Sequence, residues 1–324
     1  MKIIPIEEAV GEKLSHDLTG IIPGSMENIT YPRGYVVQAE DVERLKNMGK
    51  YHVKVIEEGS SLIHENDAAV MLASGAVGAG LDVGAAKEGK VHAFARERGL
   101  LQSSRKLLQE INMIDGLKVS AKRKHSVVEK GEKAATVVIT PLEIEKAVLE
   151  GGLELLQKPV VSVLPFGRLK IGIITTGNEV YEGRIKDAFL PYLKGKLDAF
   201  GYEALEQRIV RDEQEDIEAA IDHFVSGGFE LIFLTGGLSV DADDYTLKSV
   251  REHPDIRVVC YGSPVLPGAM FLAAYHQDRI PLIGLPAGLL RGGVSILDVV
   301  LPVLLAKVKL TKEYIASLGD GGLL

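Results

Sequence analysis

The sequence contains a single cysteine, Cys260, so no disulfide can form within the chain. Its apolar neighbours, in RVVCYG, predict a small side chain in a buried strand. No apolar run reaches the ~18 residues that are needed to span a bilayer. The first residues, MKIIPIEEAVGEKL, have one early lysine followed by acids and do not resemble a signal peptide. Together these absences predict a cytoplasmic protein that does not enter a membrane.

Positive charge is also scarce, because 37 Lys and Arg face 45 Asp and Glu, for a net charge of −8. Nonspecific binding to nucleic-acid phosphates requires clustered cations. The only such cluster, residues 122–124, is expected to be the solvated end of a strand. The 8 histidines are scattered, and neither HExxH nor a paired-cysteine spacing is present. We therefore expect no nucleic-acid partner and no zinc site.

The 324 residues, 46% apolar and 25% charged, are sufficient for two or three globular domains. We expect an N-terminal α+β segment over residues 1–80, a β-rich subdomain over 81–160 and an α/β domain over 168–324. The Pro- and Gly-bearing stretch Lys158–Arg168 is the expected boundary. From there strands alternate with helices, which predicts a three-layer αβα domain with a mostly parallel sheet.

The positions of apolar residues and helix-ending residues predict several helices. The clearest cover Glu40–Lys50, Leu62–Ala76, Asp187–Phe200 and Val294–Val308. The last is apolar nearly all round and should be buried in the domain or in an oligomer contact. Pro302 inside it predicts a kink or an early end. Asp212 and Glu215 have the spacing of a capping pair at the start of another helix.

The chain is organised around Leu169–Asp244, which contains two similar strand-to-loop transitions. The first is KIGIITTGNEV (Lys170–Val180), and the second is ELIFLTGGLSVDADDYT (Glu230–Thr246). Each begins with an apolar run typical of a strand buried on both faces. Parallel sheets bind their ligands at the carboxyl ends of the strands, where these loops emerge. If the two strands are neighbours, the loops form one crevice.

Five segments carry a family resemblance: TGNEV, GRIKDAF, TGGLSVDADDYT, LPGAM and GLPAG, in this order and spacing. Over roughly Phe166–Leu310 the chain resembles the molybdopterin-binding domain of molybdenum-cofactor biosynthesis, and in particular the molybdopterin molybdenumtransferase family. The resemblance implies binding of molybdopterin or its adenylylated form, a molybdoenzyme as partner and a homo-oligomer. For an enzyme it implies cleavage of the adenylylated pterin with metal insertion. Two alternatives stay open: a noncatalytic pterin carrier or sensor for a molybdenum hydroxylase, and a nucleotide-pyrophosphate hydrolase.

Acids follow both strands: Glu179 and Asp187 after the first, and Asp241, Asp243 and Asp244 after the second. Converging carboxylates repel one another, and a divalent cation is the usual compensation. Magnesium suits a phosphorylated ligand because it takes one or two carboxylates together with phosphate oxygens. The resemblance implies that Asp187 and Asp244 are catalytic and hold Mg²⁺. Each could equally cap the helix that follows it, and the two roles are compatible.

The resemblance also implies a set of cofactor-binding residues. Gly236 and Gly237 can bring backbone amides close to a ligand, or can simply form a tight turn. Ser239 can donate to a phosphate or stabilise its loop, and Arg291 can bind phosphate through its planar fork or be an unpaired surface residue. The full set is Thr176, Gly177, Asn178, Glu179, Gly236, Gly237, Ser239, Pro267, Gly268, Pro286 and Arg291.

The sequence departs from the family pattern at positions expected near an oxyanion. The PGKP segment of the family appears as Pro267–Met270, with Ala269 in place of the lysine. Its LPGNP segment appears as Leu285–Leu289, without the asparagine and the second proline. Asp241 stands where the family has glycine. Since losing a cation weakens binding of an anion, these changes predict a weak molybdate-dependent step.

Overall fold

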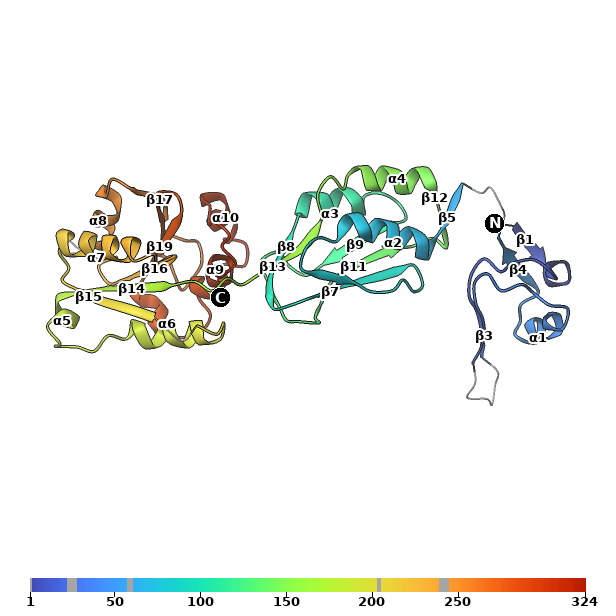
Figure 1. The fold of residues 1–324 in the computed structure, drawn as a ribbon, viewed down its shortest axis with the longest axis horizontal. Coiled ribbons are helices and arrows are strands. Elements are labelled where there is room, and N and C mark those ends of the chain that lie inside the picture. Colours follow the sequence, from blue (N-terminus) through green and yellow to red (C-terminus); the bar gives the residue numbers. More distant parts are fainter. Residues whose placement is uncertain (1, 22–27, 57–60, 203–204, 239–244) are drawn as a thin grey trace. The chain divides into compact units, whose positions relative to one another are not determined.

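The computed structural model describes residues 2–21, 28–56, 61–202, 205–238 and 245–324. The chain divides into two compact units (Figure 1). Unit 1 comprises Met1–Arg96, Gln102–Lys124 and Lys130–Val163. Unit 2 comprises Glu97–Leu101, His125–Glu129 and Leu164–Leu324. The domain borders expected at residue 80 and at residues 160–168 separate parts that should fold on their own, and they stay a prediction.

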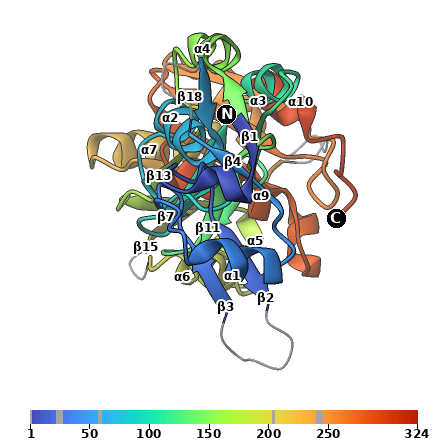
Figure 2. The same ribbon diagram turned by 90° about the vertical axis from the view of Figure 1, so that its right-hand side faces the viewer.

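The first part of unit 1 is built from short strands around one helix. The antiparallel strands β2 and β3 lie side by side (Figure 2), and β1 pairs with β4. Ile6, Leu14 and Leu45 are fully buried between these elements, so this part has a small core of its own. The elements are β1 (Lys2–Pro5), η1 (Ile6–Ala9), β2 (Leu18–Ile21), β3 (Asn28–Tyr31), α1 (Asp41–Asn47) and β4 (His52–Val55).

The rest of unit 1 contains a four-stranded antiparallel sheet of order β6-β7-β11-β9. The alanine-rich face of α2 packs on this sheet together with α3 and α4. The helices are α2 (Glu65–Ala76), α3 (Arg105–Asn112) and α4 (Lys146–Glu154). The strands are β5 (Leu62–His64), β6 (Leu81–Val83), β7 (Lys90–Ala95), β9 (Leu117–Ala121), β11 (Lys133–Ile139) and β12 (Glu143–Glu145). Strands β8 (Gly99–Ser103) and β13 (Val161–Pro165) have residues in both units, and β10 (Val127–Val128) belongs to unit 2.

The helix that the sequence predicts from Leu62 begins only at Glu65. Residues 62–64 instead form β5, which pairs antiparallel with β12. His64 ends the strand, and its Nδ1 accepts the backbone N–H of Asn66 at 3.1 Å. The prediction was wrong by one turn because the strand pairing depends on a segment far along the chain.

Unit 2 contains a six-stranded sheet of order β15-β14-β16-β19-β18-β17. The first four strands of that order are parallel, and β18 and β17 continue the sheet antiparallel. The predicted α/β class with a mostly parallel sheet is confirmed. The strands are β14 (Ile171–Thr176), β15 (Leu205–Val210), β16 (Leu231–Thr235), β17 (Ile256–Tyr261), β18 (Leu272–His276) and β19 (Ile280–Leu285).

Helices cover both faces of this sheet, and alternate strand residues face two separate cores. Ile173 and Phe233 belong to the core under α6, α9 and α10, whereas Ile174 and Leu234 belong to the core under α7 and α8. Gly172 makes room for α7, because a Cβ there would lie 2.8 Å from the ring of Phe224. The helices are α5 (Asn178–Tyr181), α6 (Phe189–Asp198), α7 (Gln214–Ser226), α8 (Thr246–Glu252), η2 (Ala287–Arg291), α9 (Ile296–Leu305) and α10 (Lys312–Ser317).

Helix α9 is buried along most of its length, as its apolar sequence predicts. It ends at Leu305, shortly after Pro302, rather than at Val308. Ala306 is the C-cap of the helix, and the next residue, Lys307, has a left-handed backbone with φ of 55°. Within the described part of the chain, no helix is long and apolar enough to cross a membrane.

Candidate functional site

The two strand-to-loop transitions lie side by side. Strands β14 and β16 are parallel neighbours, with Thr175 opposite Thr235 at their carboxyl ends. Thr235 Oγ1 donates to Thr175 Oγ1 at 3.1 Å. Thr176 Oγ1 donates to the Thr235 carbonyl at 3.3 Å and is 2.9 Å from Thr246 Oγ1. Because the proton of Thr176 is used, Thr246 is the donor in that pair. These buried hydroxyls join both strand ends to the start of α8.

The Gly236–Gly237 turn lies against these threonines. Both residues have positive φ, 87° and 55°. A Cβ on Gly236 would lie 2.2 Å from the Thr176 carbonyl oxygen, and one on Gly237 would lie 2.5 Å from Thr246 Oγ1. The tight-turn explanation for the two glycines therefore has direct structural support. The same geometry gives the turn a backbone surface without side chains, and the cofactor-binding role of the two glycines stays a prediction.

Asp212 is a residue of this crevice that sequence reasoning missed. Its Oδ1 accepts the backbone N–H of Tyr245 at 3.2 Å and lies 2.9 Å from the position a Cβ would take on Gly237. The predicted capping role was wrong, because α7 begins at Gln214 with Glu213 as its N-cap and no side-chain cap bond. Asp212 follows β15, the third parallel strand ending at this edge. Its position directly after this strand is the feature of the sequence from which its place in the crevice could have been predicted.

Asp187 is fixed at the start of α6, beside the end of β14. Its Oδ1 accepts the N–H of Phe189 at 2.9 Å, and its Oδ2 accepts the N–H of Leu190 at 3.0 Å. Gln207 Nε2 donates to Asp187 Oδ2 at 2.6 Å and to Thr175 Oγ1 at 2.8 Å. The capping role weighed for Asp187 is thus present in the structure. Its Oδ1 keeps a lone pair for a further ligand, so a metal-binding role stays a prediction.

The segment after the second strand falls outside the described residues. Ser239 and Asp244, together with Asp241 and Asp243, belong to it. Among the residues that the structure does describe, no group of three or more His, Cys, Asp or Glu side chains is arranged to hold a metal ion. Of the two predicted Mg²⁺ ligands, the structure therefore describes Asp187 alone, whose side-chain partner Gln207 also contacts the Thr175 hydroxyl.

The residues of the TGN segment lie at the rim of the crevice. Gly177, with φ of 135°, precedes the short helix α5. Asn178 is exposed, and its Oδ1 accepts the N–H of Asp212 at a long 3.4 Å. Glu179 is also exposed. Within the described residues, the Asn178 side chain is the one of these three that bonds to another residue of the crevice.

A cavity of about 380 Å³ opens where β16 and β19 end. Pro286 lies on its wall together with the Gly236–Gly237 turn, and its cofactor-binding role stays a prediction. The hydroxyl of Tyr261 donates to the Leu238 carbonyl at 2.7 Å and supports that wall. The lining residues are Gly236, Gly237, Leu238, Met270, Leu285, Pro286, Ala287 and Gly288.

Three further predicted residues lie in different surroundings. Gly268 is buried, and a Cβ there would lie 2.3 Å from Ile296 Cγ2, so its glycine is required by packing. The Pro267 carbonyl accepts the N–H of Ile296 at 3.1 Å. Arg291 is exposed at the end of η2 and has no ion pair with any residue the structure describes. The 267–268 segment thus holds α9 rather than lining the cavity.

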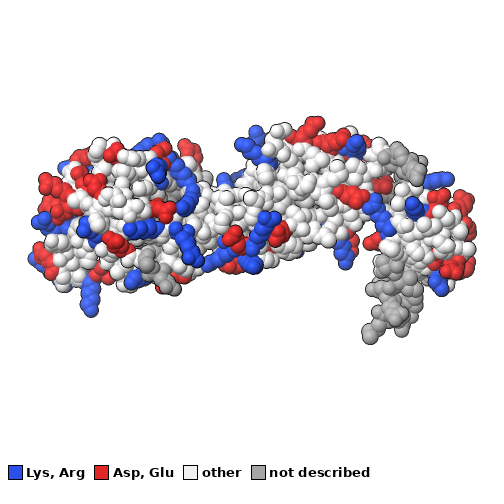
Figure 3. All heavy atoms as spheres, in the orientation of Figure 1, with Lys and Arg blue, Asp and Glu red and all other residues white. Residues whose placement is uncertain are grey.

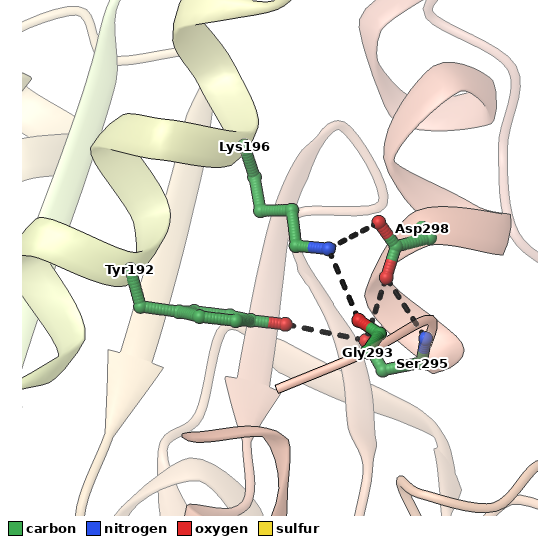
Figure 4. Close-up of polar contacts among 5 residues, drawn as sticks. All are labelled: Tyr192, Lys196, Gly293, Ser295 and Asp298. Carbon is green, nitrogen blue, oxygen red and sulfur yellow. Dashed lines mark hydrogen bonds and ion pairs between the residues drawn. The ribbon is translucent and has the colours of Figure 1, made fainter. Parts of the chain in front are cut away.

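Polar contacts at the start of α9 connect it to α6 (Figure 4). Lys196 Nζ contacts Asp298 Oδ1 at 2.5 Å and the Gly293 carbonyl at 3.4 Å. Asp298 Oδ2 accepts the N–H of Ser295 at 2.8 Å and its hydroxyl at 3.0 Å. Since the proton of Ser295 is used, Tyr192 donates to Ser295 Oγ at 3.2 Å. We call these five residues the α6–α9 tether.

Charge on unit 2 is mixed. On the face shown in Figure 3, basic and acidic side chains are interspersed, without a large area of either sign. Ion pairs such as Lys307–Glu230, 2.8 Å apart, contribute to this pattern, and the Lys307 ammonium lowers the pKa of Glu230. Steering of an anionic ligand by one broad basic surface is not a feature of this face.

Residues 172–305 match a family model described as a probable molybdopterin binding domain. This confirms the family resemblance for the segment that forms the crevice. Residues 3–57 match a second family, described only as a domain of unknown function. Because the first match covers less than half of the chain, it identifies a domain and not the whole protein.

The curated relatives are similar over a short part of their length. A CinA-like protein of Syntrophus aciditrophicus is 38% identical over 82 residues, which is 25% of this chain and 19% of that protein. A CinA-like protein of Petrotoga mobilis is 38% identical over 91 residues, which is 28% of this chain and 22% of that protein. The chain therefore spans about a fifth of the length of these relatives.

The solved structures that are similar to this chain cover less than half of it. The molybdopterin biosynthesis enzyme MoaB of Thermus thermophilus is 25% identical, with 42% of this chain and 92% of that chain covered and a TM-score of 0.37. The molybdopterin biosynthesis Mog protein of Mycobacterium ulcerans is 21% identical, with 44% and 100% covered and a TM-score of 0.37.

Proposed function

We propose that unit 2 binds molybdopterin or its adenylylated form in the crevice at the carboxyl ends of β14, β16 and β19. One observation carries the proposal: the cavity of about 380 Å³ lies inside the segment that matches the molybdopterin-binding family. Its size lies within the usual range for small-molecule sites, and ligands of parallel sheets bind at this edge. The protein would act in molybdenum-cofactor biosynthesis or delivery.

The lining of the cavity suits a flat ring carrying a phosphate. Leu238, Met270 and Leu285 give apolar surface for the faces of a pterin. The Gly236–Gly237 turn brings backbone groups close without side chains, which suits a ring edge or phosphate oxygens. The hydroxyls of Thr176 and Thr246 fix that turn against β14 and keep its shape constant when the ligand enters.

Magnesium is part of this proposal, with Asp187 and Asp244 as the residues that would hold it. The cation would neutralise phosphate charge during cleavage of the adenylylated pterin. Asp187 fits the role in part. Both of its oxygens already accept backbone N–H groups, but Oδ1 keeps one lone pair with which it can bind a metal ion. What the chain itself contributes is a carboxylate held in one orientation by two backbone amides and Gln207.

Ligand identity is the first test. The protein is purified, and bound small molecules are released and analysed by fluorescence and mass spectrometry. A pterin supports the proposal, whether the protein is an enzyme or a carrier. Nucleotide without pterin would contradict it and would support the nucleotide-pyrophosphate hydrolase, which should then hydrolyse added dinucleotide pyrophosphates. Light scattering of the same sample tests the expected homo-oligomer.

The second test separates a transferase from a carrier. Ala269 is exposed where the family has a lysine, and a cation facing a bound oxyanion contributes about 1.5–3 kcal/mol. Its absence should weaken molybdate binding roughly ten- to a hundredfold while pterin binding changes far less. With adenylylated molybdopterin, magnesium and molybdate, we expect slow nucleotide release that Ala269→Lys accelerates. A fast wild-type reaction, unchanged in Ala269→Lys, would show that another cation such as Arg291 serves the step.

A further inference from the structure

We propose that Lys196 is a positioning residue for this site, because it fastens the loop between β19 and α9 to helix α6. The inference rests on the proposed function, since the loop carries Pro286 on the cavity wall and Arg291 at the end of η2. Asp187, the acid expected to face the phosphate, lies just before helix α6 and accepts the N–H groups of Phe189 and Leu190 in its first turn. Through Lys196 the two walls of the crevice would move as one body.

The contacts of Lys196 go beyond those that a helix start requires. Ser295 and Asp298 already form a complete capping box at the N-terminus of α9. Lys196 adds a bond to the outer oxygen of Asp298 and another to the Gly293 carbonyl, which belongs to the loop. Figure 4 shows the ammonium in contact with both acceptors. The second bond restrains the loop itself.

The Lys196–Asp298 ion pair is also less exposed to solvent than the Lys307–Glu230 ion pair of the same unit. The side chains of Lys196 and Asp298 are 25% and 27% exposed, whereas those of Lys307 and Glu230 are 58% and 43% exposed. Shielding from water increases the contribution of an ion pair, while exposed pairs contribute little. Tyr192 reinforces the contact from the preceding turn of α6 through Ser295. The tether thus joins two turns of α6 to α9.

The loop needs such a restraint because it contains two adjacent glycines. Gly292 and Gly293 both have φ of 85°, and a Cβ on either would meet nothing within 4 Å. Glycine has the widest backbone freedom, and loop segments of this kind are typical hinges. If Lys196 is removed, one bond of the tether still joins α6 to the Gly293–Ser295 segment, the bond from the Tyr192 hydroxyl to Ser295 Oγ. Rotation at the glycines would then displace Arg291 and the cavity wall.

Helix α6 transmits the restraint to the other side of the crevice. Lys196 lies roughly two and a half turns after Asp187. Leu193, which lies between them, and Leu197, which follows Lys196, are both fully buried. A helix anchored by such residues moves as a rigid element. We therefore expect loop position and the position of the Asp187 carboxylate to be coupled energetically, although the two are not in contact.

The experiment uses the full-length protein with Lys196→Met, and Lys194→Met as the matched control, because Lys194 is an exposed lysine on the same helix. Hydrogen exchange is measured for amides 287–294 and for the bodies of α6 and α9. Trypsin cleavage after Arg291 gives a second measure of loop opening. We expect loop exchange and cleavage to rise roughly tenfold in Lys196→Met, with exchange of both helix bodies unchanged. Lys194→Met should match wild type, and Lys196→Arg should restore protection.

Binding of adenylylated molybdopterin is then titrated for the same variants and for Asp187→Asn, alone and combined with Lys196→Met. We expect Kd to rise roughly tenfold in Lys196→Met, and the double variant to show a coupling outside additivity. Unchanged loop exchange, exchange raised equally throughout both helices, or strictly additive effects on Kd would overturn the inference. If wild type binds no pterin, the proposed function fails, and the loop measurements alone decide the positioning role.

Discussion

Replacing Asp187 separates its capping role from a role in metal binding. The carboxylate accepts three hydrogen bonds, from the amides of Phe189 and Leu190 and from Gln207. Loss of a helix cap costs about 1 kcal/mol, and a lost bond to a charged partner adds a comparable amount. Because Asp187 is only half-buried and water can reach it, we expect Asp187→Ala to cost about 2 kcal/mol, a fall of roughly 4–8 °C in the Tm of unit 2.

Asp187→Asn should be milder but not neutral. The amide oxygen can replace Oδ2 and keep the bonds from Leu190 and Gln207, but the amide nitrogen would then face the N–H of Phe189. We expect a cost of about 1 kcal/mol. If the charge also holds magnesium, magnesium-dependent pterin binding should fall in Asn as strongly as in Ala, out of proportion to stability.

The assay is calorimetric unfolding together with hydrogen exchange at the first turn of α6, with and without magnesium and pterin. Asp198→Ala is the matched control, because Asp198 ends the same helix and its side chain has no bond within the described residues. It should change stability by no more than about 0.5 kcal/mol. If the Tm of Asp187→Ala lies within about 1 °C of the wild-type Tm, instead of roughly 4–8 °C below it, the capping argument is refuted. Magnesium-dependent binding retained in both variants would refute the metal prediction.

Three other perturbations test the structure. Gly236→Ala places a Cβ against the Thr176 carbonyl and should cost more than about 2 kcal/mol, whereas Gly228→Ala, with similar φ but open space, should cost about 1–2 kcal/mol; equal losses would contradict the close approach. Burial lowers the pKa of His64 below its usual 6.5, so the contribution of His64 to the stability of unit 1 is fully present above pH 6.5 and is lost as pH drops through the lowered pKa. His64→Asn keeps a cap and should weaken this dependence in pH-dependent melting. Limited proteolysis should cut within Lys158–Arg168 and release a folded fragment of about 150 residues, and cuts confined to residues 169–308 would contradict autonomy.

The part of the fold that could be predicted depends on local pattern. The runs Ile171–Ile174 and Leu231–Leu234 contain no polar side chain, which is enough to predict two buried strands and, if they are neighbours, a shared crevice. Capping by Asp187 was likewise one of two roles that its position before a helix allowed. Family resemblance added the order of the loops and the kind of ligand.

The remainder depends on sheet order and on partners distant in sequence. Asp212 enters the crevice because β15 lies beside β14, an order that no single segment specifies. Lys196 and Asp298 meet across 102 positions, and each alone has the appearance of an ordinary surface charge. Gly268 matched a ligand-binding pattern, yet its neighbour in space is Ile296. Such contacts exist only once the helices have packed.

The glycines around the cavity differ in how much change they tolerate, which bears on how the site could be redesigned. Gly236 and Gly237 admit no side chain, since any Cβ would collide with the threonines or with Asp212. Gly288 also lines the cavity, but a Cβ there meets nothing within 4 Å. A directed-evolution library should therefore leave the first pair fixed and randomise Gly288 with Met270. New ligand specificity would then arise from the rim, while the backbone floor stays intact.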